Sequence, residues 1–576
     1  KVLASDTANY FSANRAADRT GVSVLRAAAI TAGVCWSIAF VGVGLLYGLQ
    51  MYGDGSIFSY AVAVQDAWAI HLHNISGRIF VYLFCFVPAE AYVTLTKDPG
   101  GGVAVYGFLF FGAQLLGLGV TFSADRSRNR VIFSYACFST ACLGPLVFGF
   151  PTEMWLAHAL FWPALALCHY ASGGLVGIVI VFLVLLALVL THEGALVLAF
   201  VALTTLLLRG YRDIAFLRAV GVFAVVISIW LAVRTVFRPD DYIIGVLAAA
   251  KHNFLNIHIF TSGLFALLVI ALIGYGIFFL ILWRMGLEKA HAYSGAIVAV
   301  ALAAYWLLFE QSIHAENRYY LRTVVFIATP VFGVLAAVHA LGADGPLKLA
   351  TPVLSRMTKS LSAPVMTRAV VGALLVVTLV NAVETARFVA AWVNYMAAIG
   401  ELATSATSDP ELGDPRFVSS HRIDAALNRL SWSSTTPFLS VLVAPRFAPS
   451  RLVVDPETGY FWLSCQFATA NESAARAVPV ESRRLIRVHA CLHRPAGMAV
   501  IQSDPDHVPR SDPQPVDSAR GASSEIWSAT RHSGQHAAKN AVLPNEMMIE
   551  RRSDVHADEG DQREGSNLVG GKDRNG

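Results

Sequence analysis

Charged residues are scarce in this chain of 576 residues: Asp, Glu, Lys and Arg together make up 14% of it, whereas 55% of its residues are hydrophobic. A soluble domain carries about 25% charged residues, so this composition excludes an ordinary soluble protein and indicates one that has lipid as part of its solvent. The net charge is only +4. No stripe of Arg and Lys alternates with stacking aromatic residues, and we therefore expect no nucleic-acid partner.

Cysteine is also sparse, and most of it lies in apolar segments, where a small buried hydrophobic side chain is its ordinary role. Only Cys465 and Cys491 lie outside these segments. In an oxidising compartment these two side chains would be able to form a disulfide, but the spacing does not show that their Cβ atoms meet, so the pairing stays open. A cleavable signal peptide is not expected either, because the apolar stretch after the polar first 25 residues is too long for one.

Long apolar runs are what the chain has in abundance. A membrane-spanning helix needs about 17–25 apolar residues, or somewhat fewer where its ends are buried in protein. Eleven segments meet this criterion: Arg26–Gln50, Val103–Val120, Val131–Phe150, Met154–Leu167, Gly174–Leu190, Ala195–Leu208, Ala219–Val236, Leu264–Trp283, Gly295–Phe309, Thr323–Ala340 and Ala369–Val383.

A further apolar segment, Arg78–Thr94, is interrupted by Pro88 and Glu90. The basic residues of the membrane region fall in five clusters: Arg15/Arg19/Arg26, Arg126/Arg128/Arg130, Arg209/Arg212/Arg218, Arg284/Lys289 and Lys348/Arg356/Lys359/Arg368. If the interrupted segment makes no net crossing, all five clusters lie on one side, as the positive-inside rule requires. We therefore expect a surface-lying or re-entrant helix pair there, a cytoplasmic N-terminus and an extracytoplasmic region after Val383.

The predicted fold class is thus an all-α polytopic membrane bundle with a small mixed α/β extracytoplasmic domain and a disordered tail. Residues 1–25 would be a cytoplasmic segment, 26–388 the membrane domain of the plasma (inner) membrane, 389–496 the soluble domain and 497–576 the tail. The soluble domain is indicated by short apolar runs such as FLSVLVAP and YFWLSC between turn residues. The tail has no pattern that would form a core.

Acidic residues mark three of the expected outer turns. Asp54 lies between two glycines after the first span, Glu153 lies between two spans, and His192 and Glu193 form a third turn. Each has an ordinary explanation, such as a solvated turn or a carboxylate at a helix N-terminus. Together they favour a functional site, because charges close to hydrocarbon are costly and usually face a cavity.

Two arginines stand on the side of the membrane that carries few basic residues. Arg318 opens a span and Arg322 follows one turn later. Their position contradicts the positive-inside bias, so an anionic partner is expected. A phosphate fits the guanidinium geometry; a structural ion pair of Arg318 with Glu310 or Glu316 is the alternative.

The order of these features resembles the multi-pass C-type (GT-C) glycosyltransferases, the class of protein O-mannosyltransferases and aminoarabinose transferases. The resemblance rests on an acidic first outer loop, on GPLVFGFPTEM and LALVLTHEGAL, and on NRYYLRTVVFIATP. It implies that Asp54 is the catalytic carboxylate, that Glu153 is the second acidic residue, and that Arg318 and Tyr319 form the family's Arg-Tyr pair. The chain lacks an Asp-x-Asp pair in the first loop, so no metal ligand is assigned and a divalent metal stays possible.

The resemblance implies transfer of a sugar from a polyprenyl-phosphate donor to an acceptor at the extracytoplasmic face. Asp54 would be the general base. Arg318, with Lys251 or Arg322, would stabilise the departing phosphate. The acidic residue at the second turn and the His-Glu pair at the third would orient the acceptor or the sugar. The sugar and the acceptor are not identified.

Two other classes of function stay open. A transporter or lipid flippase would also place charges inside a helical bundle, but no inverted repeat or matched pair of broken helices is visible. A non-catalytic membrane scaffold would present the region between Glu384 and Pro495 to a partner, but would leave the outer carboxylates unexplained.

Overall fold

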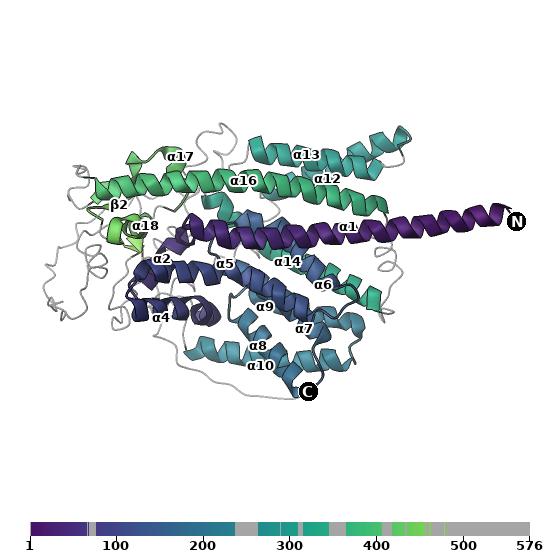
Figure 1. Ribbon diagram of the computed structural model, residues 1–576, viewed down its shortest axis with the longest axis horizontal. Coiled ribbons are helices and arrows are strands. Elements are labelled where there is room, and N and C mark those ends of the chain that lie inside the picture. Colours follow the sequence, from purple (N-terminus) through teal and green to yellow (C-terminus); the bar gives the residue numbers. More distant parts are fainter. Residues whose placement is uncertain are drawn as a thin grey trace, which may run out of the picture. The chain divides into compact units, whose positions relative to one another are not determined.

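The computed structural model describes residues 2–65, 67, 76–236, 263–287, 290–308, 315–344, 364–405, 417–432, 435–447, 449–455, 460–461 and 477–478. This part of the chain is mostly helical (Figure 1). Continuous apolar runs form helices because a backbone in hydrocarbon has no water to bind and must satisfy its hydrogen bonds internally.

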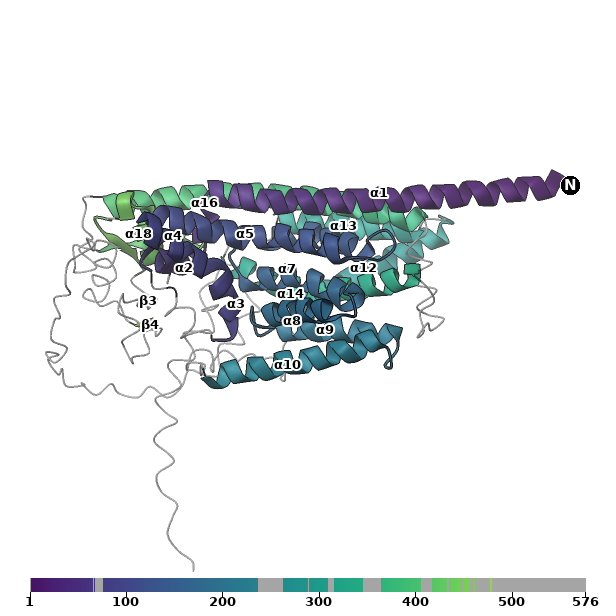
Figure 2. The same ribbon diagram turned by 60° about the horizontal axis from the view of Figure 1, so that its bottom comes forward.

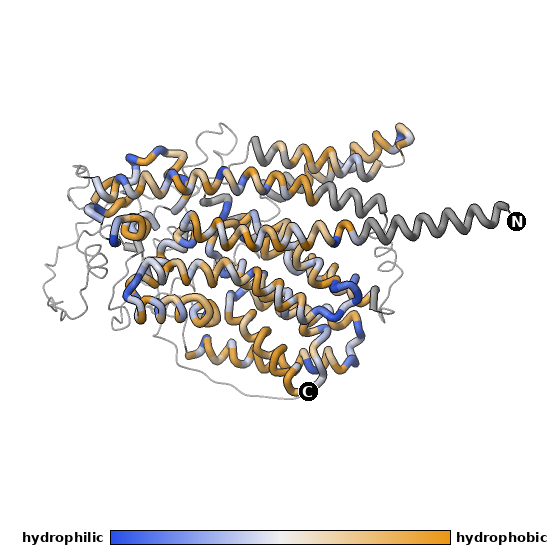
Figure 3. Tube along the Cα trace, viewed as in Figure 1, coloured by the Kyte–Doolittle hydropathy of each residue, from blue (hydrophilic) through white to orange (hydrophobic). Residues whose placement is uncertain are grey.

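Six helices in the described ranges are long and apolar enough to cross a membrane, which indicates a multi-pass membrane protein. They contain Ser23–Leu46, Ile79–Thr96, Pro99–Ala124, Ile214–Val236, Val324–Gly342 and Leu374–Thr404. Shorter apolar helices accompany them. Figure 3 shows apolar residues along most of the helices and polar residues gathered where helices end.

The helical elements of the described ranges follow one another in this order along the chain. They are α1 (Val2–Leu46), α2 (Asp54–Ala63), α3 (Ile79–Val81), a π-helix (Tyr82–Phe86), α4 (Val87–Thr96), α5 (Pro99–Ala124), α6 (Val131–Leu143), α7 (Glu153–Tyr170), α8 (Leu175–Val189), α9 (Ala195–Thr204), α10 (Ile214–Val236), α12 (Gly263–Arg284), α13 (Ala290–Leu308), α14 (Ala315–Asp344), α16 (Pro364–Thr404), α17 (Ala425–Asn428) and α18 (Thr436–Val443), with 3₁₀ turns at Leu49–Met51, Ser76–Arg78, Gly144–Val147, Thr205–Arg209, Ser420–Arg422 and Pro445–Phe447.

Each of the eleven segments chosen from the sequence overlaps one of these helices, but the bounds differ at three places. Helix α1 begins at Val2, so it includes the polar segment expected before the first span, and α16 continues to Thr404, beyond the expected boundary at residue 388. The stretch Ile79–Thr96, which we did not count as a crossing, has the length and composition of a span. Its proline lies in the first turn of α4, where a helix tolerates it.

Close backbone approaches fix the arrangement around α1. Helix α1 packs against α5, α6 and α16, and α5 packs against α7. A Cβ added at Gly33 of α1 would lie 2.4 Å from the carbonyl oxygen of Cys137, and one added at Gly117 of α5 would lie 2.3 Å from that of Ala159. Small residues at such crossings let membrane helices pack by direct backbone contact. Figures 1 and 2 both show α1 and α16 side by side.

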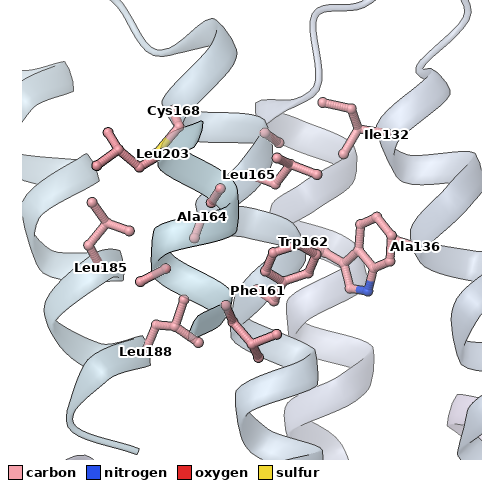
Figure 4. Close-up of a cluster of buried hydrophobic side chains, with 14 of the residues drawn as sticks. Ile132, Ala136, Phe161, Trp162, Ala164, Leu165, Cys168, Leu185, Leu188 and Leu203 are labelled. Carbon is pink, nitrogen blue, oxygen red and sulfur yellow. The ribbon is translucent and has the colours of Figure 1, made fainter. Parts of the chain in front are cut away.

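A cluster of buried apolar side chains surrounds α7. In Figure 4, Phe161, Trp162 and Leu165 of α7 lie among side chains from neighbouring helices, including Ile132 and Leu185. All five are buried. This cluster holds α6, α7, α8 and α9 together.

The described part of the region after α16 packs against the helices rather than standing alone. Strand β1 (Phe417–Ser419) pairs in parallel with β2 (Leu452–Val454), and β3 (Tyr460–Phe461) pairs antiparallel with β4 (Ala477–Val478). Helix α18 contacts α2 and α16. The hydroxyl of Ser56 lies 3.3 Å from the carbonyl oxygen of Thr435, to which it donates. Cys465, Cys491 and the tail fall outside the described residues.

Candidate functional site

A tight turn after α1 places Asp54 as the first residue of α2. Gly53 adopts φ 58° and ψ −132°, a combination that only glycine adopts readily. A Cβ on Gly53 would also lie 2.2 Å from the ring of Trp432, which packs directly on the turn. The hydroxyl of Ser56 donates to the carbonyl oxygen of Gly53 at 2.9 Å. The turn is therefore held from both sides, and the carboxylate stands at the positive end of the helix dipole.

Asp54 keeps some exposed surface although protein surrounds it. Burial raises the pKa of its carboxyl to about 6; the charge of Arg322 counteracts part of this shift. The charge of Glu153 raises the pKa of Asp54 further, and the charge of Arg78 lowers it. A carboxyl of this kind is mostly ionised at neutral pH and still takes up a proton readily, which are the properties of a general base.

Arg78, immediately before α3, joins two of the turns that carry the predicted acidic residues. Its Nη1 donates to Oε1 of Glu153 at 2.7 Å, and its Nε donates to Oε2 of Glu193 at 3.4 Å. The side chains of Arg78 and Glu153 are 16% and 6% exposed. The two carboxylates raise the pKa of Arg78 although burial alone would lower it. These contacts connect the starts of α3 and α7 with the turn between α8 and α9.

The turn between α8 and α9 supplies His192 and Glu193. The amide of Gly194 donates to Nδ1 of His192 at 3.0 Å, so this nitrogen is an acceptor and the neutral ring carries its proton on Nε2. Burial, followed by the charge of Arg78, lowers the pKa of His192 to about 3. Burial alone would raise the pKa of Glu193, but Arg78 brings it below its ordinary value. At neutral pH this turn therefore presents a neutral imidazole beside a carboxylate.

Arg234, in the last turn of α10, lies on the other side of the same carboxylate, with Nη2 3.8 Å from Oε1 of Glu193. The cluster thus contains three carboxylates and three guanidinium groups, contributed by six separate stretches of chain: Asp54, Arg78, Glu153, Glu193, Arg234 and Arg322. Because opposite charges are matched in number, the cluster tolerates its burial at a membrane boundary.

Arg318 lies beside this cluster but is enclosed by aromatic rings. Its guanidinium carbon is 3.7 Å from the ring centre of Phe388 and 5.6 Å from that of Tyr52. It donates to the carbonyl oxygen of Phe148 and is only 4% exposed. Burial lowers its pKa to about 10. This enclosure favours a structural role for Arg318, which fastens α14 to α16 and to the turn before α7.

The sequence predicted a convergence of distant residues, and the structure brings five of the predicted ones together: Asp54, Glu153, His192, Glu193 and Arg322. Arg318 adjoins them through Tyr52. Burial raises the pKa of Tyr52, and the charges of Arg318 and Asp54 both act on its hydroxyl group. Lys251 and the side chain of Tyr319 lie outside the described part of the structure.

Two residues of the cluster, Arg78 and Arg234, were missed from the sequence. The signal was present, because both arginines stand at the ends of apolar segments and outside the five basic clusters. The same reasoning that selected Arg322 would have selected them. Arg78 was assigned only as the boundary of an apolar segment, and Arg234 as the end of a span.

A second group of buried polar side chains, centred on His158, has structural partners. His158, in the middle of α7, lies 2.9 Å from the hydroxyl of Ser139 and 3.1 Å from Oε1 of Gln114, and Gln114 donates to Thr140 at 2.7 Å. Such bonds hold membrane helices together. Within the described ranges, no group of three or more His, Cys, Asp or Glu side chains is arranged to hold a metal ion.

Comparisons of the chain with protein-family models, curated protein sequences and solved structures find no match. The argument about function therefore rests on the geometry of the cluster.

Proposed function

We propose that the protein is a membrane glycosyltransferase that moves a sugar from a polyprenyl-phosphate donor to an acceptor hydroxyl at the extracytoplasmic face. The observation that carries this proposal is the environment of Asp54: a carboxyl with a pKa of about 6, partly exposed, and acted on by the charge of Arg322. A general base and a cation lie together here, next to the ends of membrane helices. This pair suits a reaction in which a hydroxyl is deprotonated and a lipid phosphate departs.

In the proposed reaction the oxygen of the acceptor hydroxyl attacks the anomeric carbon of the sugar. The bond between that carbon and the phosphate oxygen breaks, and polyprenyl phosphate leaves with the bonding electrons. Asp54 takes the proton of the attacking hydroxyl. Arg322 stabilises the negative charge that develops on the phosphate. Direct displacement of this kind inverts the anomeric configuration.

The remaining members of the cluster hold the reacting groups in place. Glu153 is fixed by its 2.7 Å contact with Arg78, so it orients the acceptor rather than accepting its proton. The neutral imidazole of His192 and the carboxylate of Glu193 face the same region. A rigid arrangement of this kind contributes to catalysis by positioning the reactants.

The proposed topology has eleven crossings, a cytoplasmic N-terminus and no net crossing by Ile79–Thr96. Helix α7 supports it, because the helix begins at Glu153 in the cluster and ends at Tyr170, whose ring lies 5.5 Å from the guanidinium of Arg209. Helix α10 likewise begins near the basic Arg218 and ends with Arg234 in the cluster. Basic residues at the end opposite the cluster make that end cytoplasmic.

A donor-consumption assay tests the proposed function. The purified protein, reconstituted in vesicles, is incubated with radiolabelled polyprenyl-phosphate sugars and an extract that contains acceptors. A glycosyltransferase converts the donor to polyprenyl phosphate and labelled product. A flippase moves the labelled lipid between leaflets and leaves it intact, and a scaffold does neither. Intact donor after prolonged incubation with every sugar would contradict the proposal.

A further inference from the structure

Around Glu193 lies a group of polar atoms that take no part in the proposed proton transfer or in the departure of the phosphate. Oε1 of Glu193, Nε of Arg234 and Nε1 of Trp230 are all buried atoms without a hydrogen-bond partner among the described residues. A buried polar atom without a partner is destabilising, so folded proteins seldom keep several of them close together without a ligand or bound water.

The three side chains are close neighbours. Arg234 and Trp230 lie one turn apart on α10, and the guanidinium carbon is 4.8 Å from the centre of the indole ring. The same guanidinium lies 3.8 Å from Oε1 of Glu193. The side chains of Arg234 and Glu193 are 19% and 17% exposed, so both reach the surface through other atoms although the atoms named above are covered.

His192 adds a further donor to this group. Because its Nδ1 accepts from the amide of Gly194, its Nε2 carries a proton. One carboxylate oxygen and the N–H groups of Arg234 and Trp230 therefore lie close together, and the imidazole of His192 adjoins them, with its Nδ1 3.9 Å from Oε2 of Glu193. Sugar hydroxyls both donate and accept hydrogen bonds, and neighbouring hydroxyls on a ring match such a mixed set. A simple anion fits less well, because the carboxylate would repel it.

Gly77 leaves space beside the carboxylate oxygen that has no hydrogen-bond partner. A Cβ built on Gly77 would lie 2.9 Å from Oε1 of Glu193, so any larger residue would press on this oxygen and displace it. Gly77 belongs to the 3₁₀ turn Ser76–Arg78, in which other residues are allowed. The glycine is thus needed for space and not for its backbone conformation.

We propose that Glu193, Arg234, Trp230 and His192 form a subsite that binds the hydroxylated ring of the lipid-linked sugar. This inference rests on the proposed function and assigns the recognition of the sugar to the turn between α8 and α9 and the end of α10. Asp54 and Arg322 then face the anomeric carbon and the phosphate. The subsite would distinguish a sugar-carrying lipid from the bare lipid phosphate.

The test is a binding measurement that needs no catalysis. The protein is placed in lipid nanodiscs free of sugar-based detergent and titrated with polyprenyl phosphate carrying mannose, glucose, galactose or aminoarabinose, and with bare polyprenyl phosphate. We expect at least one sugar lipid to bind about tenfold more tightly than the bare lipid, the effect of one or two hydrogen bonds to a charged group. An acceptor is then added to the complex. Consumption of the bound sugar lipid shows that the sugar in the subsite is the one that the enzyme transfers.

Two variants probe the subsite and leave the ion pairs of Glu193 in place. Gly77→Val presses a side chain against the carboxylate oxygen, and Trp230→Phe removes only the indole N–H. Each is expected to reduce the preference for the sugar lipid severalfold and to leave the affinity for bare polyprenyl phosphate unchanged. Gly112→Val is the control, because a Cβ there would meet nothing within 4 Å.

Equal affinities for sugar-carrying and bare lipids would overturn the subsite, as would a Gly77→Val protein that keeps the full preference. If the wild-type protein nonetheless consumes a lipid-linked sugar, the proposed function stands and only the subsite fails. If the protein neither binds nor consumes any of the four sugar lipids, both proposals fail.

Discussion

Arg78 and Glu153 form a 2.7 Å ion pair between residues that are 75 positions apart in the chain. The pair joins the start of α3 to the start of α7, and the same guanidinium also reaches Glu193 at 3.4 Å. The turn before α3, the start of α7 and the turn between α8 and α9 are thereby held together.

Replacement of Arg78 by Gln is expected to destabilise the protein strongly. The change leaves Glu153 and Glu193 buried without their main cationic partner, and breaking a buried ion pair in this way costs about 3–5 kcal/mol. Thermal unfolding of the purified protein, followed by tryptophan fluorescence, measures the loss.

Arg387→Gln is the matched control for this experiment. Arg387 pairs with Glu384 at 2.9 Å, but its side chain is 52% exposed. Exposed pairs contribute about 0–1 kcal/mol, so this variant is expected to unfold close to the wild-type temperature. Equal losses in the two variants would contradict the structural role assigned to Arg78.

Gly53→Ala is expected to disrupt the turn that positions Asp54. Its φ of 58° and ψ of −132° strain any other residue, and the new Cβ would lie 2.2 Å from Trp432. The backbone strain alone costs about 1–3 kcal/mol. Gly112→Ala, in α5 with open space around it, is expected to be neutral or stabilising, since Ala favours a helix more than Gly does. Unfolding temperatures of the two variants compare the two sites.

The helices were predictable from the sequence, whereas the partners within the site were only partly so. Long apolar runs specify helices in lipid whatever their neighbours are, which is why all eleven segments overlap helices. Asp54, Glu153 and Glu193 were identified because a charged side chain close to hydrocarbon is costly and usually faces a cavity or a partner. The pairing of Glu153 with Arg78 rather than with Arg318 depends on how the helices pack, and one sequence does not contain that information.

The rate of sugar transfer is expected to depend on pH through Asp54. A general base works when it is deprotonated, so the rate rises as pH increases through the pKa of about 6 and then levels off. Arg322 lowers this pKa, so Arg322→Gln should move the midpoint to higher pH as well as reduce the rate. The profile of kcat/KM against pH, at constant ionic strength, gives both midpoints. An unchanged midpoint in Arg322→Gln would contradict the assigned contact.

Asp54→Asn is expected to be as stable as the wild type or more stable at neutral pH. The pKa of Asp54 is raised above the ordinary value of 3.8, so folding favours the protonated carboxyl. That contribution to stability is present at low pH and is lost as pH rises from about 4 to about 6. Asn imitates the protonated form and avoids the loss. Unfolding temperatures at pH 5 and pH 8 test this, and a variant less stable than wild type at pH 8 would contradict the burial of a charged Asp54.

The most direct test of the account is the rate at which Asp54→Asn protein consumes a radiolabelled lipid-linked sugar that the wild-type protein uses. The account predicts a loss of about 100-fold or more, the range for removal of a general base. Asp98→Asn, an exposed carboxylate immediately before α5, should leave the rate unchanged. A folded Asp54→Asn protein that transfers sugar at the wild-type rate would contradict the account.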